Sequence, residues 1–212
     1  MKLLQITDIH LTAPGKTIGG RDPNANFAKA LAHATSHHPD AETLIITGDL
    51  SDWGEAADYA RLKAQLADLP MPVHLCIGNH DDRQTFLNVF PEKESADGFV
   101  QQVVPLSMGY AILLDTWGPD THAGHFCAAR ADWLSAQLEI LEGPIWIFMH
   151  ADRSRPDGQD HAAARRPLCR HGRAPCRQNP PHIPRPLSYA SLWRTPRHPV
   201  FRAPRHEPCR LA

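Results

Sequence analysis

The chain has 212 residues, with 22 Lys and Arg against 23 Asp and Glu, and a formal net charge of −1. This length is enough for one ordinary domain with a buried core. No apolar run approaches the roughly 18 residues needed to span a bilayer. We therefore expect no membrane partner. The first residues lack the pattern of a signal peptide, and the five cysteines have no paired metal-type spacing. We therefore expect a reduced, cytoplasmic chain.

The near-zero net charge conceals two parts of opposite charge. Residues 1–150 hold nine basic and nineteen acidic side chains, a net charge of −10. Residues 151–212 hold thirteen Arg, no Lys, four acidic side chains and eleven of the twenty prolines, a net charge of +9. The second part has few aliphatic residues and no sustained periodicity, so it cannot easily offset the entropy of ordering. We expect a folded core over 1–150 and a largely disordered tail over 151–212.

Strands and helices alternate along the first part. Short apolar runs predict strands within residues 1–10, 41–50, 72–82, 109–117 and 144–150. Apolar residues at helical spacing predict helices over residues 24–38, 55–69 and 129–141. This alternation predicts a layered α/β fold, in which ligands bind beyond the carboxyl ends of the strands.

Polar side chains able to bind a metal follow four of the predicted strands. They are Asp8 and His10, then Asp49, then Asn79 and His80, and finally His150. Taken singly, each is commoner as a surface carboxylate, a hydrogen-bonded turn or a strand cap. Together, at the strand ends of one α/β frame, they favour a shared site.

The chemistry of these side chains points to a cation. Asp8 and His10 are two residues apart, which in an extended segment places both on one face. A carboxylate with an imidazole suits Fe, Mn or Zn. The two oxygens of Asp49 can bridge two metal ions, and Asn79 offers a neutral amide oxygen. His80 is adjacent to Asn79 and so points elsewhere, free to act on a substrate.

The ordered set "ITDIH", "ITGDL", "GNHDDR", "LLDT" and "ADWLSAQL" resembles the calcineurin-like metallophosphoesterases, in particular the class III cyclic nucleotide phosphodiesterases. The resemblance covers residues 1–150. It implies a four-layer α-β-β-α sandwich, incomplete at its carboxyl end. It also implies two divalent metal ions, either Fe, Mn or Zn. The first would be held by Asp8, His10 and Asp49, and the second by Asp49, Asn79 and His150.

The same resemblance implies hydrolysis of a 3′,5′-cyclic nucleotide, such as cyclic AMP, to the 5′-monophosphate through a bridging hydroxide. Two metal ions neutralise a phosphodiester and lower the pKa of a bound water. The catalytic residue would be His80, which contacts the phosphate and assists the leaving oxygen. The substrate would lie against His10, Asp49, Asn79 and His80. Other phosphodiesters or phosphomonoesters remain alternatives, as does a homodimer.

The resemblance also implies a Gly-His-x-His motif that completes both metal sites near the carboxyl end. None of the five histidines after His150 stands in that motif: His161, His171, His182, His198 and His206. A change of reading frame after His150 would explain the loss. With GC-rich codons, parts of the tail read one base later give Gly-His-Ser-His and Gly-Thr-Asn-His. The alternatives are a genuine Arg/Pro-rich extension and a truncated, inactive family member.

The tail carries no other clear function. No aromatic interleaving or helical face organises its arginines, so we expect no nucleic-acid partner. Cys169 and Cys176 lie near His171, but their spacing fits no zinc-finger pattern. A small-molecule phosphodiester is therefore the expected partner.

Overall fold

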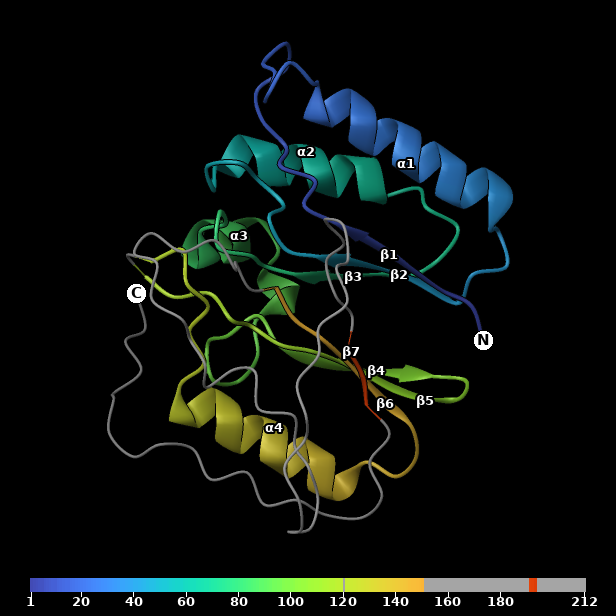
Figure 1. The fold of residues 1–212 in the computed structure, drawn as a ribbon, viewed down its shortest axis with the longest axis vertical. Helices are drawn as coiled ribbons and strands as arrows, with labels where there is room; N and C mark the ends of the chain where they lie inside the picture. The colour runs from blue at the N-terminus through green and yellow to red at the C-terminus, as the bar shows by residue number, and fades with distance from the viewer. Residues whose placement is uncertain (120, 151–190, 194–212) are drawn as a thin grey trace, which may run out of the picture.

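The computed structural model describes residues 1–119, 121–150 and 191–193. Two β-sheets lie face to face, and helices cover the outer face of each (Figure 1). The order of layers is helices, first sheet, second sheet, helix. The expected α-β-β-α sandwich is therefore confirmed.

The first sheet consists of three parallel strands in the order β1 (Leu3–Thr7), β2 (Thr43–Thr47) and β3 (Val73–Cys76). The helices α1 (Pro23–His37) and α2 (Ala56–Leu66) lie along its outer side (Figure 1). All five residues of β2 are buried, as in a strand that is covered on both faces.

The second sheet has the order β4 (Gln102–Leu106), β5 (Gly109–Leu113), β6 (Ile145–Phe148) and β7 (Ser191–Trp193). β4 and β5 form an antiparallel hairpin, β5 and β6 are parallel, and β6 pairs antiparallel with β7. The crossover from β5 to β6 runs through α4 (Ala128–Ile140), which packs on the outer face of this sheet (Figure 1).

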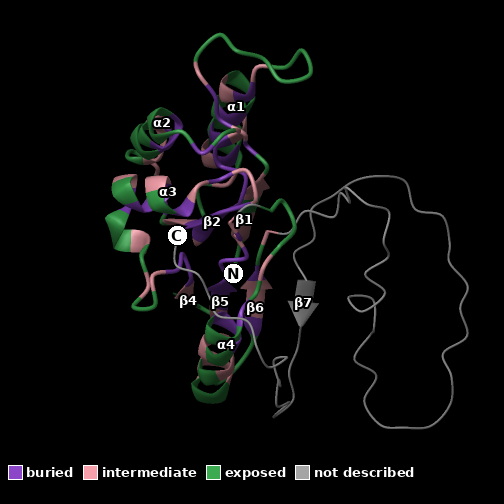
Figure 2. Ribbon diagram, turned by 90° about the vertical axis from the view of Figure 1, so that its left-hand side faces the viewer, coloured by how far each residue is buried: buried purple, intermediate pink, exposed green. Residues whose placement is uncertain are grey.

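The sheets share an apolar layer. It contains the buried side chains of Ile45 and Cys76 from the first sheet and those of Val104, Leu113 and Phe148 from or next to the second. Figure 2 shows this buried zone between β1, β2 and the strands β4 to β6. Ile45 faces this layer, whereas its neighbours Leu44 and Ile46 belong to the core under α1 and α2. The alternation of side chains along β2 thus joins both cores.

All five predicted strands and three predicted helices are present, with ends shifted by a few residues. The prediction missed β4, α3 (Arg83–Val89), the short η1 (Pro91–Lys93) and β7, which lies in the part of the chain expected to be disordered. β4 contains Pro105, a residue that argues against a central strand and is tolerated here because β4 is at a sheet edge. α3 is only seven residues long, too short for a periodic signal.

Only β7 of the 151–212 tail is among the described residues, where it pairs with β6. The expected disorder, the changed reading frame and the cysteines of the tail otherwise fall outside them. Within the described part, no helix combines the length and the apolar character that crossing a bilayer requires.

Candidate metal centre

The six predicted site residues follow the carboxyl ends of β1, β2, β3 and β6, and the structure brings them to one edge of the two sheets. Parallel strands expose their carboxyl ends at the same side, which is where α/β proteins bind ligands. The side-chain atoms of Asp8, His10 and Asp49 that could hold a metal lie within 4.8 Å of one another. His150 Nε2 lies 3.3 Å from Asp49 Oδ2 and 3.1 Å from Asn79 Oδ1.

The backbone at this edge has an unusual conformation. Asp8, His10 and Asp49 have φ angles of 56°, 44° and 47°, and they alone among the described non-glycine residues have positive φ. Such conformations cost on the order of 1–3 kcal/mol and cluster at functional sites. The explanation expected from sequence was therefore wrong, because β1 ends at Thr7 and Asp8 and His10 are not extended. Two left-handed residues, rather than strand alternation, bring this pair together.

Two glycines leave room for the site. A Cβ atom at Gly48 would lie 2.4 Å from the His150 ring, and one at Gly78 would lie 2.3 Å from Asp49. Gly48 also has φ 78°, a value that glycine adopts without strain. The glycines before Asp49 and Asn79 therefore allow the first sheet to approach the histidine of the second.

Asp49 lies at the centre of the cluster. Its Oδ2 is 3.5 Å from His10 Nε2 and 3.3 Å from His150 Nε2. Its Oδ1 accepts a hydrogen bond of 3.0 Å from the backbone N–H of His80. Burial raises the pKa of Asp49, but the hydrogen bond and charge of His150 outweigh that effect and hold the pKa below its usual value. One carboxylate thus stands between two imidazoles from different sheets.

His150 is oriented by the first sheet. Its Nδ1 donates to the carbonyl of Thr47 at 3.0 Å, so Nε2 faces Asn79 Oδ1 at 3.1 Å and the carboxylate of Asp49. Burial lowers the pKa of His150, yet the hydrogen bond to Asp49 and its charge raise it to about 9. An imidazole nitrogen, a carboxylate and an amide oxygen that face one another are a donor set for a divalent cation. The residues on this side therefore fit a metal.

Asp52 is a functional candidate that the sequence analysis missed. Its Oδ1 accepts from His10 Nδ1 at 3.1 Å, and its backbone carbonyl accepts from His80 Nδ1 at 3.0 Å. His10 is thereby left with Nε2 facing Asp49 Oδ2 at 3.5 Å, and His80 uses only Nδ1 in its contact with Asp52. A carboxylate on the far nitrogen is the usual partner of a metal-binding histidine. The signal was present, since Asp52 follows Asp49 in "GDLSD", but the interpretation stopped at Gly-Asp.

His122 is a second candidate that the sequence analysis missed. It lies on the loop between β5 and α4. Its Nδ1 accepts from Asn79 Nδ2 at 3.2 Å, and its ring centroid is 5.4 Å from that of His80. This contact turns the Asn79 oxygen toward His150. No sequence pattern marks His122, because its partner is 43 residues away.

Asp81 braces the loops that carry the site. Its buried carboxylate accepts from the backbone N–H groups of Leu50, Ser51 and Gly78 at 2.7 to 3.1 Å. It also accepts from the hydroxyl of Tyr59 at 3.0 Å. Burial raises the pKa of Asp81 to about 6, while the backbone donors oppose this shift. One side chain thus connects the loops after β2 and β3.

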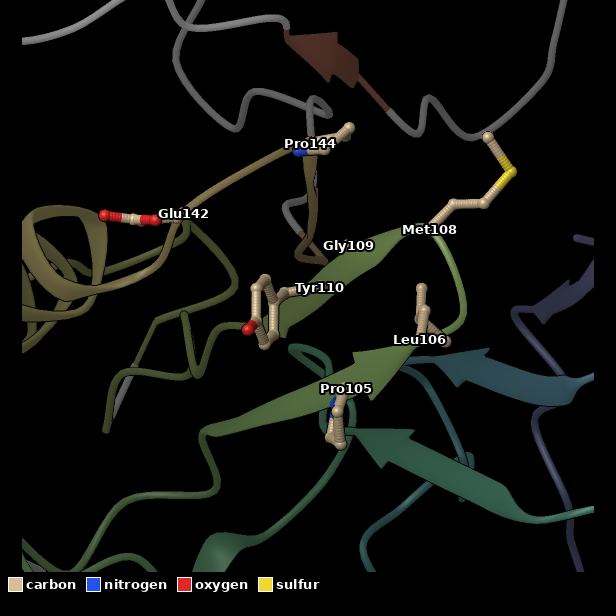
Figure 3. A pocket seen from close by; sticks show the side chains of 7 residues that line it. All are labelled: Pro105, Leu106, Met108, Gly109, Tyr110, Glu142 and Pro144. Atoms are coloured by element: carbon tan, nitrogen blue, oxygen red, sulfur yellow. The ribbon is translucent and has the colours of Figure 1, made fainter.

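A shallow pocket of about 260 Å³ lies elsewhere, at the β4–β5 turn and the amino ends of β5 and β6 (Figure 3). It is lined by Pro105, Leu106, Met108, Gly109, Tyr110, Glu142 and Pro144. None of the predicted site residues lines it. Glu142 is the one carboxylate among the residues that line this pocket, and no histidine or cysteine lines it, so the metal centre remains the candidate functional site.

Comparison of the sequence with known proteins identifies the family of this chain. The model of the calcineurin-like phosphoesterase family matches residues 1–161. A probable cyclic nucleotide phosphodiesterase of Rhodopseudomonas palustris is 37% identical over 155 residues, 71% of this chain and 57% of that protein. A 3′,5′-cyclic-nucleotide phosphodiesterase of Nostoc is 29% identical over 154 residues, with 71% and 56% covered.

A further relative is named differently. A probable glycerophosphodiester phosphodiesterase of Arcobacter nitrofigilis is 24% identical over 154 residues, with 71% of this chain and 56% of that protein covered. The chain thus spans little more than half the length of the curated relatives it matches. Since the family model covers most of the sequence and the strand ends carry a shared cluster, this chain belongs to the calcineurin-like phosphoesterase family.

Proposed function

We propose that the chain is a metal-dependent phosphodiesterase domain that hydrolyses a 3′,5′-cyclic nucleotide to the 5′-monophosphate. The observation that carries this proposal is the position of Asp49 Oδ2, within 3.5 Å of His10 Nε2 and 3.3 Å of His150 Nε2. A single oxygen between two imidazoles is suited to bridging two cations. Members of this family use divalent metal ions.

Two sets of side chains that both include Asp49 would each hold one metal ion. The His10 site would consist of Asp8, His10 and Asp49, and the His150 site of Asp49, Asn79 and His150. Oxygen and imidazole donors of this kind suit Fe, Mn or Zn. When bound, the ions supply positive charge that neutralises the phosphodiester and lower the pKa of a bound water.

His80 is the proposed proton donor. Because its Nδ1 donates to the Asp52 carbonyl, Nε2 is the ring nitrogen that can reach a substrate. As water adds to phosphorus and the bond from phosphorus to the 3′ oxygen breaks, protonated His80 gives its Nε2 proton to the departing oxygen. The attacking water releases one proton to the solvent, and His80, left neutral, takes one back from the solvent, so protons and charge balance. His10, Asp49 and Asn79 line the position of the phosphate.

The substrate class is supported by the relatives named as cyclic nucleotide phosphodiesterases. The relative named as a glycerophosphodiester phosphodiesterase favours a second candidate, a glycerophosphodiester, cleaved at the same site. Rates on cyclic AMP and on glycerophosphoethanolamine, measured side by side, would separate the two.

A third candidate is a chain without turnover. The tail contains no Gly-His-x-His motif, so each site has three ligands from the described residues. Loss of one histidine at each site should weaken metal binding. Mn²⁺ bound well below two ions per chain, together with no hydrolysis, would favour this candidate.

The decisive experiment compares two purified chains. One is the 212-residue chain, and the other continues after His150 in the shifted frame. Each is assayed with Mn²⁺ or Fe²⁺ on cyclic AMP and on bis-p-nitrophenyl phosphate. Metal-dependent hydrolysis by the continued chain supports the proposal. If the continued chain is folded but inactive on both substrates, the proposal fails.

A further inference from the structure

A second cluster of charged side chains lies beside the metal centre, buried between α3, α4 and the end of β5. It consists of Arg83, Asp115 and Arg130, whose exposed fractions are 2%, 0% and 1%. Asp115 accepts two hydrogen bonds from Arg83, at 2.7 and 3.1 Å, and one from Arg130 at 3.2 Å. It also accepts from the backbone N–H groups of Val100 and Trp117. We call these three residues the arginine cluster.

The cluster joins three sequence motifs through residues that the proposed reaction does not use. Arg83 closes "GNHDDR", Asp115 belongs to "LLDT", and Arg130 directly precedes "ADWLSAQL". Two guanidinium groups share one carboxylate, and the ring of Phe99 lies about 5 Å from both. Buried charges of this kind are costly to desolvate and are weak evidence for stability alone. A role in positioning the neighbouring loop would explain the cost of burying these charges better than a role in stability alone.

The arginine cluster holds the loop that follows Asp115. The carbonyl of Trp117 accepts from both Arg83, at 3.1 Å, and Arg130, at 2.9 Å. Arg130 Nη2 also donates to His125 Nδ1 at 2.8 Å. The loop is thus tied at both ends, with His122 between the ties.

This loop reaches the metal centre at two points. At its start, the hydroxyl of Thr116 donates to the carbonyl of His150. Further along, His122 Nδ1 accepts from the amide of Asn79, so the Asn79 oxygen faces His150. Arg83 begins α3, four residues after Asn79, and donates to the carboxylate of Asp115. The segment that carries Asn79 is therefore held by the same carboxylate as the loop that carries His122.

We propose that the arginine cluster is a positioning device that sets His122 against Asn79 and thereby aims the Asn79 oxygen into the His150 site. The proposal rests on the proposed function in one respect, the identity of that site as a metal site. Arg83, Asp115 and Arg130 touch neither substrate nor metal in this arrangement. They act through the loop of residues 116–125.

The test uses the metal-free 212-residue chain and its Arg130→Gln variant. Leu138→Ala is the matched control, because Leu138 packs the same helix α4 on the second sheet without a hydrogen bond to the loop. Hydrogen exchange in peptides covering residues 116–126 is measured first. We expect faster exchange there in Arg130→Gln than in the control. Equal exchange in both variants would overturn the proposal.

Mn²⁺ titration by calorimetry is the second measurement. Arg130→Gln should weaken binding at the His150 site by roughly tenfold, as removal of an outer-shell partner typically does, and leave the His10 site unchanged. Loss of affinity at both sites, or at neither, contradicts the positioning role. If the parent chain binds no Mn²⁺, the proposed function loses its support, while hydrogen exchange still decides the positioning role.

A milder variant covers the case in which Arg130→Gln does not fold. His125→Ala removes only the ring that accepts from Arg130 Nη2. It should give the same faster exchange over residues 116–126 and a smaller loss of Mn²⁺ affinity. If His125→Ala exchanges like the parent chain over residues 121–126, the contact with Arg130 does not hold this end of the loop and the proposal is wrong.

Discussion

Asp52 accepts a hydrogen bond of 3.1 Å from His10 Nδ1, while His10 Nε2 faces Asp49. The carboxylate fixes the orientation of the ring, so that the other nitrogen faces the site. Asp52→Asn should therefore lower the affinity of the His10 site for Mn²⁺ by roughly 10- to 100-fold without unfolding the protein. Calorimetric titration measures this loss.

Asp68→Asn is the control for the lost charge, because Asp68 is exposed beyond the end of α2. Its Mn²⁺ affinity should equal that of the parent chain. Equal affinities in Asp52→Asn and Asp68→Asn would show that the contact between Asp52 and His10 does not support the site.

Asp49 and His150 should differ in how many sites they support. Because Asp49 Oδ2 lies near both His10 Nε2 and His150 Nε2, Asp49→Asn should abolish both Mn²⁺ binding steps. His150→Ala should abolish only the step at the His150 site. Metal content after dialysis, measured by mass spectrometry, distinguishes the variants. A bridging role is excluded if Asp49→Asn retains as much metal as His150→Ala.

The metal-free protein should lose stability in mild alkali. The Asp49 carboxylate helps to raise the pKa of His150 to about 9 in the folded state, above its ordinary 6.5. Protonated His150 therefore stabilises the fold fully below pH 6.5, and this contribution disappears as the pH rises through 9. The loss should be on the order of 3 kcal/mol.

Urea unfolding in EDTA at several pH values between 6 and 10 measures this loss. His150→Gln provides the comparison, since glutamine does not titrate in this range. A parent chain whose unfolding free energy follows that of His150→Gln across the whole series would refute the linkage.

Tyr59 supports the loop that follows β3 and carries part of the site. Its hydroxyl donates to Asp81 at 3.0 Å and accepts from the backbone N–H of Asp82 at 3.0 Å. Tyr59→Phe leaves the buried carboxylate of Asp81 and the half-buried backbone N–H of Asp82 with one hydrogen bond fewer each, so it should cost about 1–3 kcal/mol of unfolding free energy. Thermal and urea unfolding measure the difference.

Tyr110→Phe is the matched control for Tyr59→Phe. The hydroxyl of Tyr110 makes no hydrogen bond to any of the described residues. This substitution should change the unfolding free energy by no more than about 0.5 kcal/mol. If the two substitutions lower the unfolding free energy equally, the hydrogen bond from Tyr59 to Asp81 does not contribute to stability.

The reading frame after His150 is open to a direct test. Genomic DNA across codons 150–160 should contain, one base over, an open frame that continues with family-like sequence and a Gly-His-x-His motif. Its two histidines would complete the His10 site and the His150 site. A frame that closes at once would instead favour a genuine Arg/Pro-rich extension.

Much of the core was predictable because its information is local. β2 is a continuous apolar run, and α1, α2 and α4 repeat apolar residues at helical spacing, so each element carries its own signal. The edge strand β4 escaped because Pro105 breaks its pattern, and α3 escaped because seven residues show no period.

The candidate site divides in the same way. The order of residues predicts that the strand ends carry Asp8, His10, Asp49, Asn79, His80 and His150, because these residues lie at or shortly after the ends of apolar runs. How they meet follows from the tertiary fold. The left-handed backbone at Asp8 and His10 replaces the extended geometry expected for them.

Tertiary structure alone also added Asp52, His122 and the arginine cluster. His122 touches Asn79 across 43 residues, and Arg83 meets Asp115 across 32. Contacts at such separations depend on how the two sheets pack, which no local pattern encodes. The side chains at the strand ends can therefore be predicted from the order of residues. The side chains that orient them depend on how one sheet packs on the other.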